Sequence, residues 1–317
     1  MAQDKIAILM STYNGHDYVA DQIQSIINQT YQNWTLYIRD DGSSDNTREI
    51  IKRFANRDSR IILTNPDHSD NLGSVGSFFE LLKSTNADFY MFSDQDDYWK
   101  KDKVNNTLEE MKRAHYQDKA CCVYSNLQVV DNKLKGDKPL LTNHWQDFTQ
   151  LIFTNNAYGC TMMINQALKD MIHFNELDLD YIYMHDWWLM LIASAFGEIK
   201  YLNEKTILYR QHEDNQVGAS QKTFKAIVHR LFNQDRDRTA MQRSIRLAYE
   251  FNKEYGDNEL LSSRDRIYVL EYGKLVQDSS FFHNFGLALK LPPQSVYKLK
   301  ELFYSYIMIC FNKDYLD

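Results

Sequence analysis

Short apolar segments that alternate with amphipathic ones dominate the first part of the chain. The apolar runs at 6–10, 34–38, 60–63 and 88–92 have the length of strands. Between the first two runs, Val19, Ile23, Ile26 and Ile27 recur at the spacing of one helical face. Strands that alternate with helices favour a mostly parallel sheet covered on both faces. We therefore predict an α/β fold with a Rossmann-like central sheet flanked by helices.

Polar clusters follow three of these predicted strands. The sequences STYN, RDDGSSD and SDQDD come after the strands at 6–10, 34–38 and 88–92. In open parallel sheets the ligand site lies at the carboxyl ends of the strands, so we expect the clusters to meet there. A D-x-D triplet at a strand end offers carboxylate oxygens to Mg²⁺. A solvated acidic turn or a helix cap is the alternative interpretation of the same residues.

The charge distribution argues against nucleic acid as a partner and divides the chain into two parts. The net charge is −7, which disfavours a polyanionic partner. Residues 221–317 carry 15 basic and 12 acidic side chains, which leaves 21 basic and 31 acidic ones in 1–220. From residue 221 the pattern is helical, with a break at Pro292–Pro293. We expect an α/β domain at 1–220 and a helical C-terminal region at 221–317.

The cysteines and the apolar runs indicate a cytoplasmic protein. Cys121, Cys122, Cys160 and Cys310 include no CxxC pair, so buried free thiols are expected rather than disulfides or zinc ligands. The N-terminus lacks the pattern of a signal peptide, and no apolar run has the length of a transmembrane helix. We therefore expect a reducing compartment and no membrane-spanning segment.

The polar motifs, taken in order, resemble those of one family. STYNG, QTYQNW, RDDGSSDNT, NLGSVGSF and SDQDDYW follow one another, and the set resembles the family 2 glycosyltransferases over residues 5–215. The resemblance implies a GT-A fold, a nucleotide-diphosphate sugar donor, Mg²⁺ or Mn²⁺, and an inverting mechanism. SDQDD together with HDWW resembles bacterial rhamnosyltransferases of cell-wall and O-antigen polysaccharide assembly. That branch implies dTDP-β-L-rhamnose as the donor and a lipid-linked saccharide as the acceptor.

The resemblance also implies roles for residues at the strand ends. Asp41 would bind the edge of the base, and Asn71 would approach the donor. Asp94 would face the ribose or the sugar, while Asp96 would ligate a cation that bridges the two phosphates. Asp97 is an additional carboxylate of this branch and receives no role. The nucleotide pocket itself would be lined by Ser11, Thr12 and Tyr13.

An inverting transfer needs a base, because the acceptor hydroxyl loses its proton in a single displacement. The resemblance assigns this role to Asp186 in MHDWWL, although the commonest form of the family has Glu at the position of His185. From the residues alone, the favoured interpretation is that Asp186 caps the helix that follows, with Trp187 in the core. His185 and Trp187 are also candidates for contact with the acceptor or the sugar.

Two further segments supply candidates for the site. YRQHEDN places Arg210 and His212 after an apolar strand; the resemblance suggests that His212 contacts the metal or the diphosphate, and an arginine can pair with phosphate oxygens. The processive motif Q-x-x-R-W is replaced here, which argues against a processive enzyme. In NNAYGCTMMIN, Gly159 and Cys160 are expected to line the acceptor or sugar site, for which Arg210 is a further candidate. A covalent role for Cys160 is not expected, because inverting transfer needs no covalent intermediate.

The C-terminal region has an amphipathic pattern that leaves three interpretations open. Lys298 and Lys300 stand beside Leu302, Phe303, Tyr306 and Ile307 at helical spacing. Such a helix can bind peripherally to the inner face of the cell membrane. It can equally pack against the catalytic domain or form a homodimer.

We therefore predict a metal-dependent inverting glycosyltransferase that moves L-rhamnose from dTDP-β-L-rhamnose. A transferase that uses a UDP-hexose or a UDP-N-acetylhexosamine is the first alternative. A non-catalytic nucleotide-sugar-binding subunit is disfavoured, because Asp41, Asp96 and Asp186 are all present. A metal-dependent nucleotidyltransferase would need a glycine-rich, basic phosphate loop near the first strand, and STYNGHDY lacks one.

Overall fold

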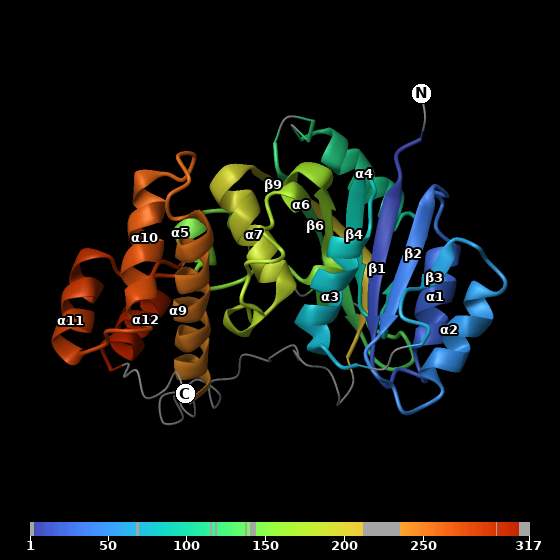
Figure 1. The fold of residues 1–317 in the computed structure, drawn as a ribbon, viewed down its shortest axis with the longest axis horizontal. Coiled ribbons are helices and arrows are strands. Elements are labelled where there is room, and N and C mark those ends of the chain that lie inside the picture. Colours follow the sequence, from blue (N-terminus) through green and yellow to red (C-terminus); the bar gives the residue numbers. More distant parts are fainter. Residues whose placement is uncertain are drawn as a thin grey trace.

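The computed structural model describes residues 3–67, 70–114, 116–117, 119–136, 138–139, 144–211, 235–295 and 297–310. Its strands form one mixed sheet, and further helices stack beside it (Figure 1). The strands are β1 (Ile6–Thr12), β2 (Trp34–Asp40), β3 (Ile61–Leu63), β4 (Phe89–Ser93), β5 (Tyr98–Trp99), β6 (Cys121–Val130), β7 (Lys138–Pro139), β8 (Met162–Asn165) and β9 (Glu198–Arg210). The predicted α/β architecture with a helical C-terminal region is confirmed.

The first half of the sheet is the parallel, doubly wound part. β3, β2, β1 and β4 lie in this order and pair in parallel. Successive side chains of a strand point to opposite faces, so Ile6 and Ile8 of β1 belong to one hydrophobic cluster, and Ala7 and Leu9 belong to the other. Helices pack on each face: α1 (Val19–Ile27), α2 (Thr47–Ala55) and α4 (Lys103–Lys112) on the first, and α3 (Gly73–Ser84), α6 (Gln166–Asp170) and α7 (His185–Phe196) on the second.

The second half of the sheet is mixed and brings distant segments to the strand ends. β8 lies between β4 and β6 and is antiparallel to both. β9 pairs in parallel with β6, with an irregularity in register near Ser125 and Asn126, and β5 pairs with β9. The loop 94–97 therefore runs from β4 to β5, next to the end of β9 at Arg210.

The C-terminal helices share a core with the α/β part. They are α9 (Asp235–Tyr255), α10 (Ser263–Lys274), α11 (Phe281–Lys290) and α12 (Lys298–Ile309). Phe251 of α9 packs against Trp188 of α7, with 5.6 Å between ring centroids, and against Phe148 of the short helix α5 (Phe148–Leu151), at 5.0 Å. The predicted division between residues 220 and 221 falls outside the described residues. None of the described helices has both the length and the apolar character needed to cross a bilayer.

Candidate active site

Three strand ends meet at one edge of the sheet, as the motif positions predict. The register pairs Thr12 of β1 with Asp40 of β2, and Met10 of β1 with Ser93 of β4. The polar residues that follow these positions are therefore neighbours. Of the residues predicted for the nucleotide pocket, Ser11 is half-buried and Thr12 is buried, while Tyr13 is 52% exposed. Tyr13 is thus the member of this set whose side chain is open to solvent.

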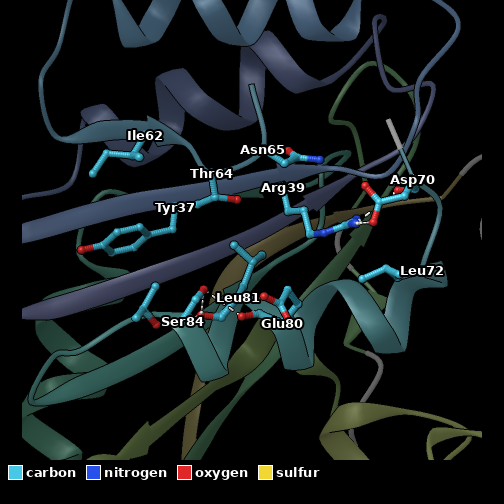
Figure 2. A pocket seen from close by; sticks show the side chains of 11 residues that line it. Tyr37, Arg39, Ile62, Thr64, Asn65, Asp70, Leu72, Glu80, Leu81 and Ser84 are labelled. Carbon is cyan, nitrogen blue, oxygen red and sulfur yellow. Dashed lines mark hydrogen bonds and ion pairs between the residues drawn. The ribbon is translucent and has the colours of Figure 1, made fainter. Parts of the chain in front are cut away.

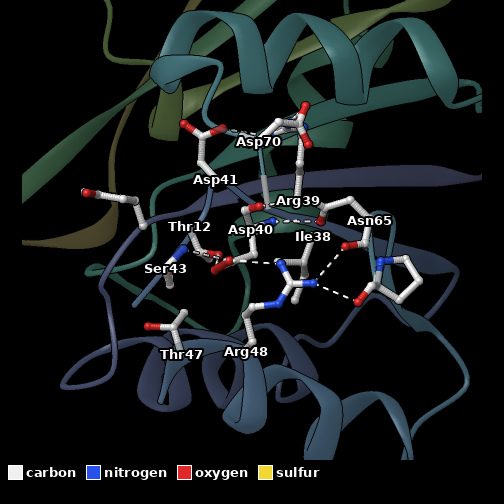
Figure 3. Close-up of polar contacts among 12 residues, drawn as sticks. Thr12, Ile38, Arg39, Asp40, Asp41, Ser43, Thr47, Arg48, Asn65 and Asp70 are labelled. Atoms are coloured by element: carbon white, nitrogen blue, oxygen red, sulfur yellow. Dashed lines mark hydrogen bonds and ion pairs between the residues drawn. The ribbon is translucent and has the colours of Figure 1, made fainter. Parts of the chain in front are cut away.

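Asp40 is an internal anchor of the strand ends (Figure 3). Its side chain is fully buried, and Oδ1 accepts hydrogen bonds from the Ser43 amide at 3.0 Å and from Arg48 Nη1 at 3.1 Å. Arg48 Nη2 donates to the carbonyls of Asn65 (2.9 Å) and Pro66 (2.8 Å). The buried charge is therefore paired, which is the condition for burying it at acceptable cost. Asp40 holds the turn after β2 and is unavailable to a ligand.

Asp41, the residue predicted to bind the base, also fixes the entry to α3. Its Oδ1 forms an ion pair with Arg39 and accepts from the Leu72 amide and the Ser77 hydroxyl, each at 2.8 Å. Asn71, the predicted donor contact, donates from Nδ2 to the Asp41 carbonyl at 2.9 Å. All these side-chain bonds converge on Oδ1, so Oδ2 is the oxygen that remains for a ligand.

The loop 94–97 brings three carboxylates together. Asp94 and Asp96 are half-buried, and Asp97 is fully buried. Burial raises the pKa of Asp94 to about 7, helped by the negative charges of Asp96 and Asp186. Burial, with Asp96 and Asp94, also raises the pKa of Asp97 well above its ordinary range. The carboxylates therefore destabilise one another's ionised forms.

One buried oxygen of this cluster has no nitrogen or oxygen donor in the part of the chain that the structure describes. Ligand atoms of Asp94, Asp97 and Cys160 lie within 4.8 Å of one another. Asp97 Oδ1 accepts from the Arg210 amide at 3.2 Å, whereas Oδ2 accepts from no nitrogen or oxygen of the described residues, and the Cys160 thiol is the side-chain donor near this carboxyl. Carboxylate oxygens are the ligands that Mg²⁺ and Mn²⁺ prefer. The cluster therefore suits a divalent cation, but Asp96, the predicted ligand, is not one of its three members. His212, the other predicted metal ligand, lies outside the described residues.

Arg210 holds the carboxylate loop in place. The side chain is almost fully buried, and its Nε donates to the Asp96 carbonyl at 2.9 Å. Nη1 donates to the carbonyl of Asn132 at 2.7 Å, and Nη2 pairs with Asp21 at 3.2 Å. With these donors occupied inside the protein, Arg210 positions the loop, whereas the sequence suggested that it faces the sugar.

Asp186 is not the cap of its helix. α7 begins at His185, its N-cap is Met184, and no side chain caps it. The Asp186 carboxylate instead accepts from the Gly159 amide at 2.8 Å and from Asn155 Nδ2 at 2.9 Å. Burial raises the pKa of Asp186 to about 7, even though these hydrogen bonds oppose the shift. The carboxyl can therefore take up or release a proton near neutral pH.

Gly159, which donates its amide to Asp186, is also in close contact with the His185 ring. The buried His185 ring lies between Phe78 and Phe92, with centroids 4.2 and 4.9 Å away. Burial lowers the pKa of His185 to about 3, so the imidazole is neutral. A Cβ atom at Gly159 would lie 2.5 Å from His185 Nε2. The absence of a side chain at 159 thus allows both this contact and the hydrogen bond to Asp186.

The other candidates of this region are buried. Trp187 Nε1 donates to the Leu151 carbonyl at 2.5 Å, and its ring belongs to the core. Burial raises the pKa of the Cys160 thiol well above its usual range, helped by Asp97 and Asp94. A thiol in that state is a poor nucleophile.

Comparison with known proteins gives the family. The model "Glycosyl transferase family 2" matches residues 7–174, more than half of the chain. The chain belongs to this family. It is 34% identical over 236 residues to the dTDP-rhamnosyl transferase RfbG of Shigella flexneri, covering 70% of this chain and 78% of the relative.

Other relatives of this glycosyltransferase carry different names. The UDP-Glc:alpha-D-GlcNAc-diphosphoundecaprenol beta-1,3-glucosyltransferase WfgD of Escherichia coli is 28% identical over 199 residues, covering 62% of this chain and 73% of WfgD. The structure of residues 1–349 of TarS from S. aureus in complex with UDP superposes with a TM-score of 0.55 at 14% identity, covering 96% of this chain and 80% of TarS 1–349. That likeness confirms the fold.

Gln95 is a residue of this site that the sequence did not single out. Its side-chain amide pairs with the backbone of Tyr13 in both directions: Tyr13 N donates to Oε1, and Nε2 donates to the Tyr13 carbonyl, each at 2.9 Å. Gly15 packs so closely against this amide that a Cβ would collide with it. Gln95 thereby fastens the carboxylate loop to the end of β1. Asn155, which holds Asp186, was also missed.

A separate groove of about 830 Å³ lies on the surface between α3 and the β2–β3 edge (Figure 2). It is lined by residues that include Tyr37, Ile62 and Leu81, with Arg39 and Asp70 at one end. The carboxylates of the 94–97 loop and Asp186 are not among its lining residues. Arg39 lines this groove and also forms the ion pair with Asp41, so the groove borders the strand-end cluster.

Proposed function

We propose that this glycosyltransferase is a metal-dependent, inverting enzyme that transfers L-rhamnose from dTDP-β-L-rhamnose to a lipid-linked saccharide during synthesis of a bacterial surface polysaccharide. The observation that carries the proposal is the placement of Asp186. Its buried carboxyl has a pKa of about 7 and interacts electrostatically with Asp94 at the strand ends. The dTDP-rhamnosyl transferase among the relatives supports the choice of donor.

The proposed reaction is a single displacement. The acceptor hydroxyl oxygen bonds to the anomeric carbon of the sugar while its proton passes to a carboxylate oxygen of Asp186. The bond from that carbon to the diphosphate breaks, and its electron pair leaves with the nucleoside diphosphate. The Gly159 amide and Asn155 hold the Asp186 carboxylate in one orientation, so the base is positioned before the acceptor arrives.

The remaining roles concern the donor. Tyr13, with Ser11 and Thr12, would line the nucleotide pocket, and Asp41 would offer Oδ2 to the base. Asp96 would hold Mg²⁺ or Mn²⁺, with Asp94 on the side of the ribose or sugar; His212 remains a predicted ligand. When bound, the cation would supply positive charge to the departing diphosphate. Mutual repulsion among the three carboxylates of the 94–97 loop supports a cation at this position.

A UDP-hexose or UDP-N-acetylhexosamine is the second candidate donor, because WfgD is named for UDP-glucose. The test is a donor panel. Purified protein is incubated with dTDP-β-L-rhamnose, UDP-glucose or UDP-N-acetylglucosamine, with Mn²⁺ or with EDTA, and with or without a polyprenyl-diphosphate-linked saccharide. We expect release of dTDP that depends on both metal and acceptor. Release of UDP alone would shift the assignment to the second candidate, and no release from any donor would contradict both.

A further inference from the structure

Helices α11 and α12 expose large apolar side chains that a water-soluble surface usually hides. Phe282 is 85% exposed and Leu299 is 81% exposed. Single exposed apolar residues are common, but a group on neighbouring elements marks a binding surface. The group, which we call the outer face, consists of Phe281, Phe282, Phe285 and Leu289 on α11 and Leu299, Leu302 and Tyr306 on α12.

The exposed side chains lie on faces that the fold does not use. In α11 the exposed positions 281, 282, 285 and 289 follow one helical face, while Asn284 and Leu287 are buried. In α12, Leu299, Leu302 and Tyr306 share a face that excludes the buried Tyr304, Ile307 and Met308. Asn284 Nδ2 donates to the Met308 carbonyl at 2.9 Å, which joins the two helices along their inner sides. Each helix thus has a packed inner face and an apolar outer one.

The charge around the outer face is opposite in sign to that of the whole chain. Between Ser279 and Cys310 there are three lysines, Lys290, Lys298 and Lys300, and one acidic residue, Glu301. The segment therefore carries +2, or +1 with the adjacent Asp278, on a chain with a net charge of −7. Lys290 and Lys298 are exposed, and Lys298 also pairs with Glu301 at 2.8 Å. Aromatic and aliphatic side chains flanked by lysines are the composition that binds the interface of an anionic bilayer.

We propose that the outer face docks on the surface of an anionic lipid bilayer, with the apolar side chains in the headgroup region and the lysines on the lipid phosphates. A second copy of the chain suits this face less well. In a two-fold symmetric dimer the same surface meets itself, so the net positive segments would face each other. Figure 1 shows α11 at the end of the molecule remote from β1–β3, with no other drawn element beyond it. The proposal does not depend on the identity of the donor sugar.

The experiment measures binding of the full chain to vesicles by co-sedimentation. The vesicles contain phosphatidylcholine alone or phosphatidylcholine mixed with phosphatidylglycerol. We expect binding to the mixed vesicles that weakens with salt, since surface attraction is screened, and much weaker binding to neutral vesicles. The double variant Phe282→Ser/Leu299→Ser should lower the affinity at least about tenfold through lost apolar burial. Lys290→Glu, which reverses the charge of an exposed lysine, should lower it by a similar factor.

Leu260→Ser is the matched control, because Leu260 is 75% exposed but lies outside the outer face. It should bind as the unsubstituted chain does. Since Phe282 and Leu299 are mostly in water, all variants should keep the unsubstituted melting temperature, which excludes unfolding as the cause of lost binding. Equal binding to both vesicle types, or unchanged binding by the serine variant, would overturn the proposal. A solution dimer dissociated by Phe282→Ser/Leu299→Ser, without vesicle binding, would assign the face to a second copy.

Discussion

The strand-end site and the outer face of α11 and α12 depart from the usual distribution of residues in opposite directions. At the strand ends, Asp97 and Asp186 are carboxyl groups buried in protein. On the outer face, Phe282 and Leu299 are apolar side chains left in water. Neither arrangement stabilises the folded chain, because buried charge and exposed apolar surface both cost free energy. Under the two proposals, a bound cation and acceptor at the first region and a lipid surface at the second offset these costs.

The largest expected effect comes from removing the proposed base. If the burial of Asp186 serves catalysis, Asp186→Asn should lower kcat about 10²- to 10⁴-fold, the usual contribution of a general base. Donor affinity should stay within about twofold, because the substitution leaves the predicted nucleotide pocket intact. The measurement is the steady-state rate with saturating acceptor, together with donor binding by calorimetry. Asp180→Asn, at an exposed carboxylate nearby, is the control, and an unchanged kcat for Asp186→Asn would refute the role.

The raised pKa of Asp186 can be tested on the stability of the fold, independently of catalysis. The pKa of Asp186 rises from 3.8 unfolded to about 7 folded, so its contribution to stability is present below about pH 4 and is lost as pH rises to 7. The loss amounts to roughly 4 kcal/mol at 1.36 kcal/mol per pKa unit. Asp186→Asn should therefore gain stability relative to the unsubstituted chain between pH 5 and pH 8, measured by urea unfolding. A difference that does not vary with pH would contradict the raised pKa.

The rate of transfer should also depend on the protonation of Asp186, but it should increase as the carboxyl loses its proton. A general base works only when deprotonated, so kcat should rise with pH through a limb near about 7. The charge of Asp94, whose pKa is also about 7, can broaden this limb. A profile that is flat from pH 5 to pH 8 would argue against a carboxyl of raised pKa as the base.

A smaller effect is expected at Gly159, whose missing side chain leaves room for the His185 ring. Gly159→Ala would place a methyl group 2.5 Å from His185 Nε2, which should cost about 1–3 kcal/mol of stability through overpacking. It should also lower kcat, because the Gly159 amide that holds Asp186 must move. The double variant Gly159→Ala/His185→Ala should cost less than the sum of its single variants. The free energy of unfolding is measured by chemical denaturation. If the costs of the two single substitutions are additive, the contact between the introduced methyl group and His185 is not what destabilises the Gly159→Ala variant.

The smallest expected effect on activity is at Gln95, which joins the carboxylate loop to β1. Gln95→Ala removes two hydrogen bonds to Tyr13, worth about 0.5–1.5 kcal/mol each. The donor KM should rise about tenfold with little change in kcat, because the predicted nucleotide pocket and metal site lose their alignment. Gln24→Ala, which removes an exposed glutamine contact on α1, is the control. A fall in kcat without a change in KM would contradict the alignment role.

The regular parts of the fold could be predicted because periodicity records which face of each element is buried. The strands at β1, β2 and β4 and the helix that begins at His185 follow from apolar spacing, and the strand ends follow from parallel pairing. What Gln95 contacts could not be predicted, because its partner Tyr13 lies 82 positions away and the bonds involve backbone atoms. For the same reason, the sequence could not predict which oxygen of Asp41 accepts the hydrogen bonds.

The C-terminal helices and the helix at Asp186 show a different limit of prediction from sequence. Amphipathic spacing predicted that α12 has an apolar face, but a pattern does not tell whether that face is covered. Ile307 of the predicted set packs inward, while Leu302 and Tyr306 are exposed. For Asp186, the sequence favoured a helix cap, and only the position of the 155–161 segment reveals that its carboxylate is held by Gly159 and Asn155.

The anomeric configuration of the first product tests the central claim most directly. The claim is that buried carboxylates at the strand ends support a single displacement with Asp186 as base. The product formed from dTDP-β-L-rhamnose and the acceptor is analysed by NMR through the one-bond C1–H1 coupling. The account predicts an α-linked rhamnoside, with inversion at the anomeric carbon. A β-linked product would mean retention and would contradict both the single displacement and the role of Asp186.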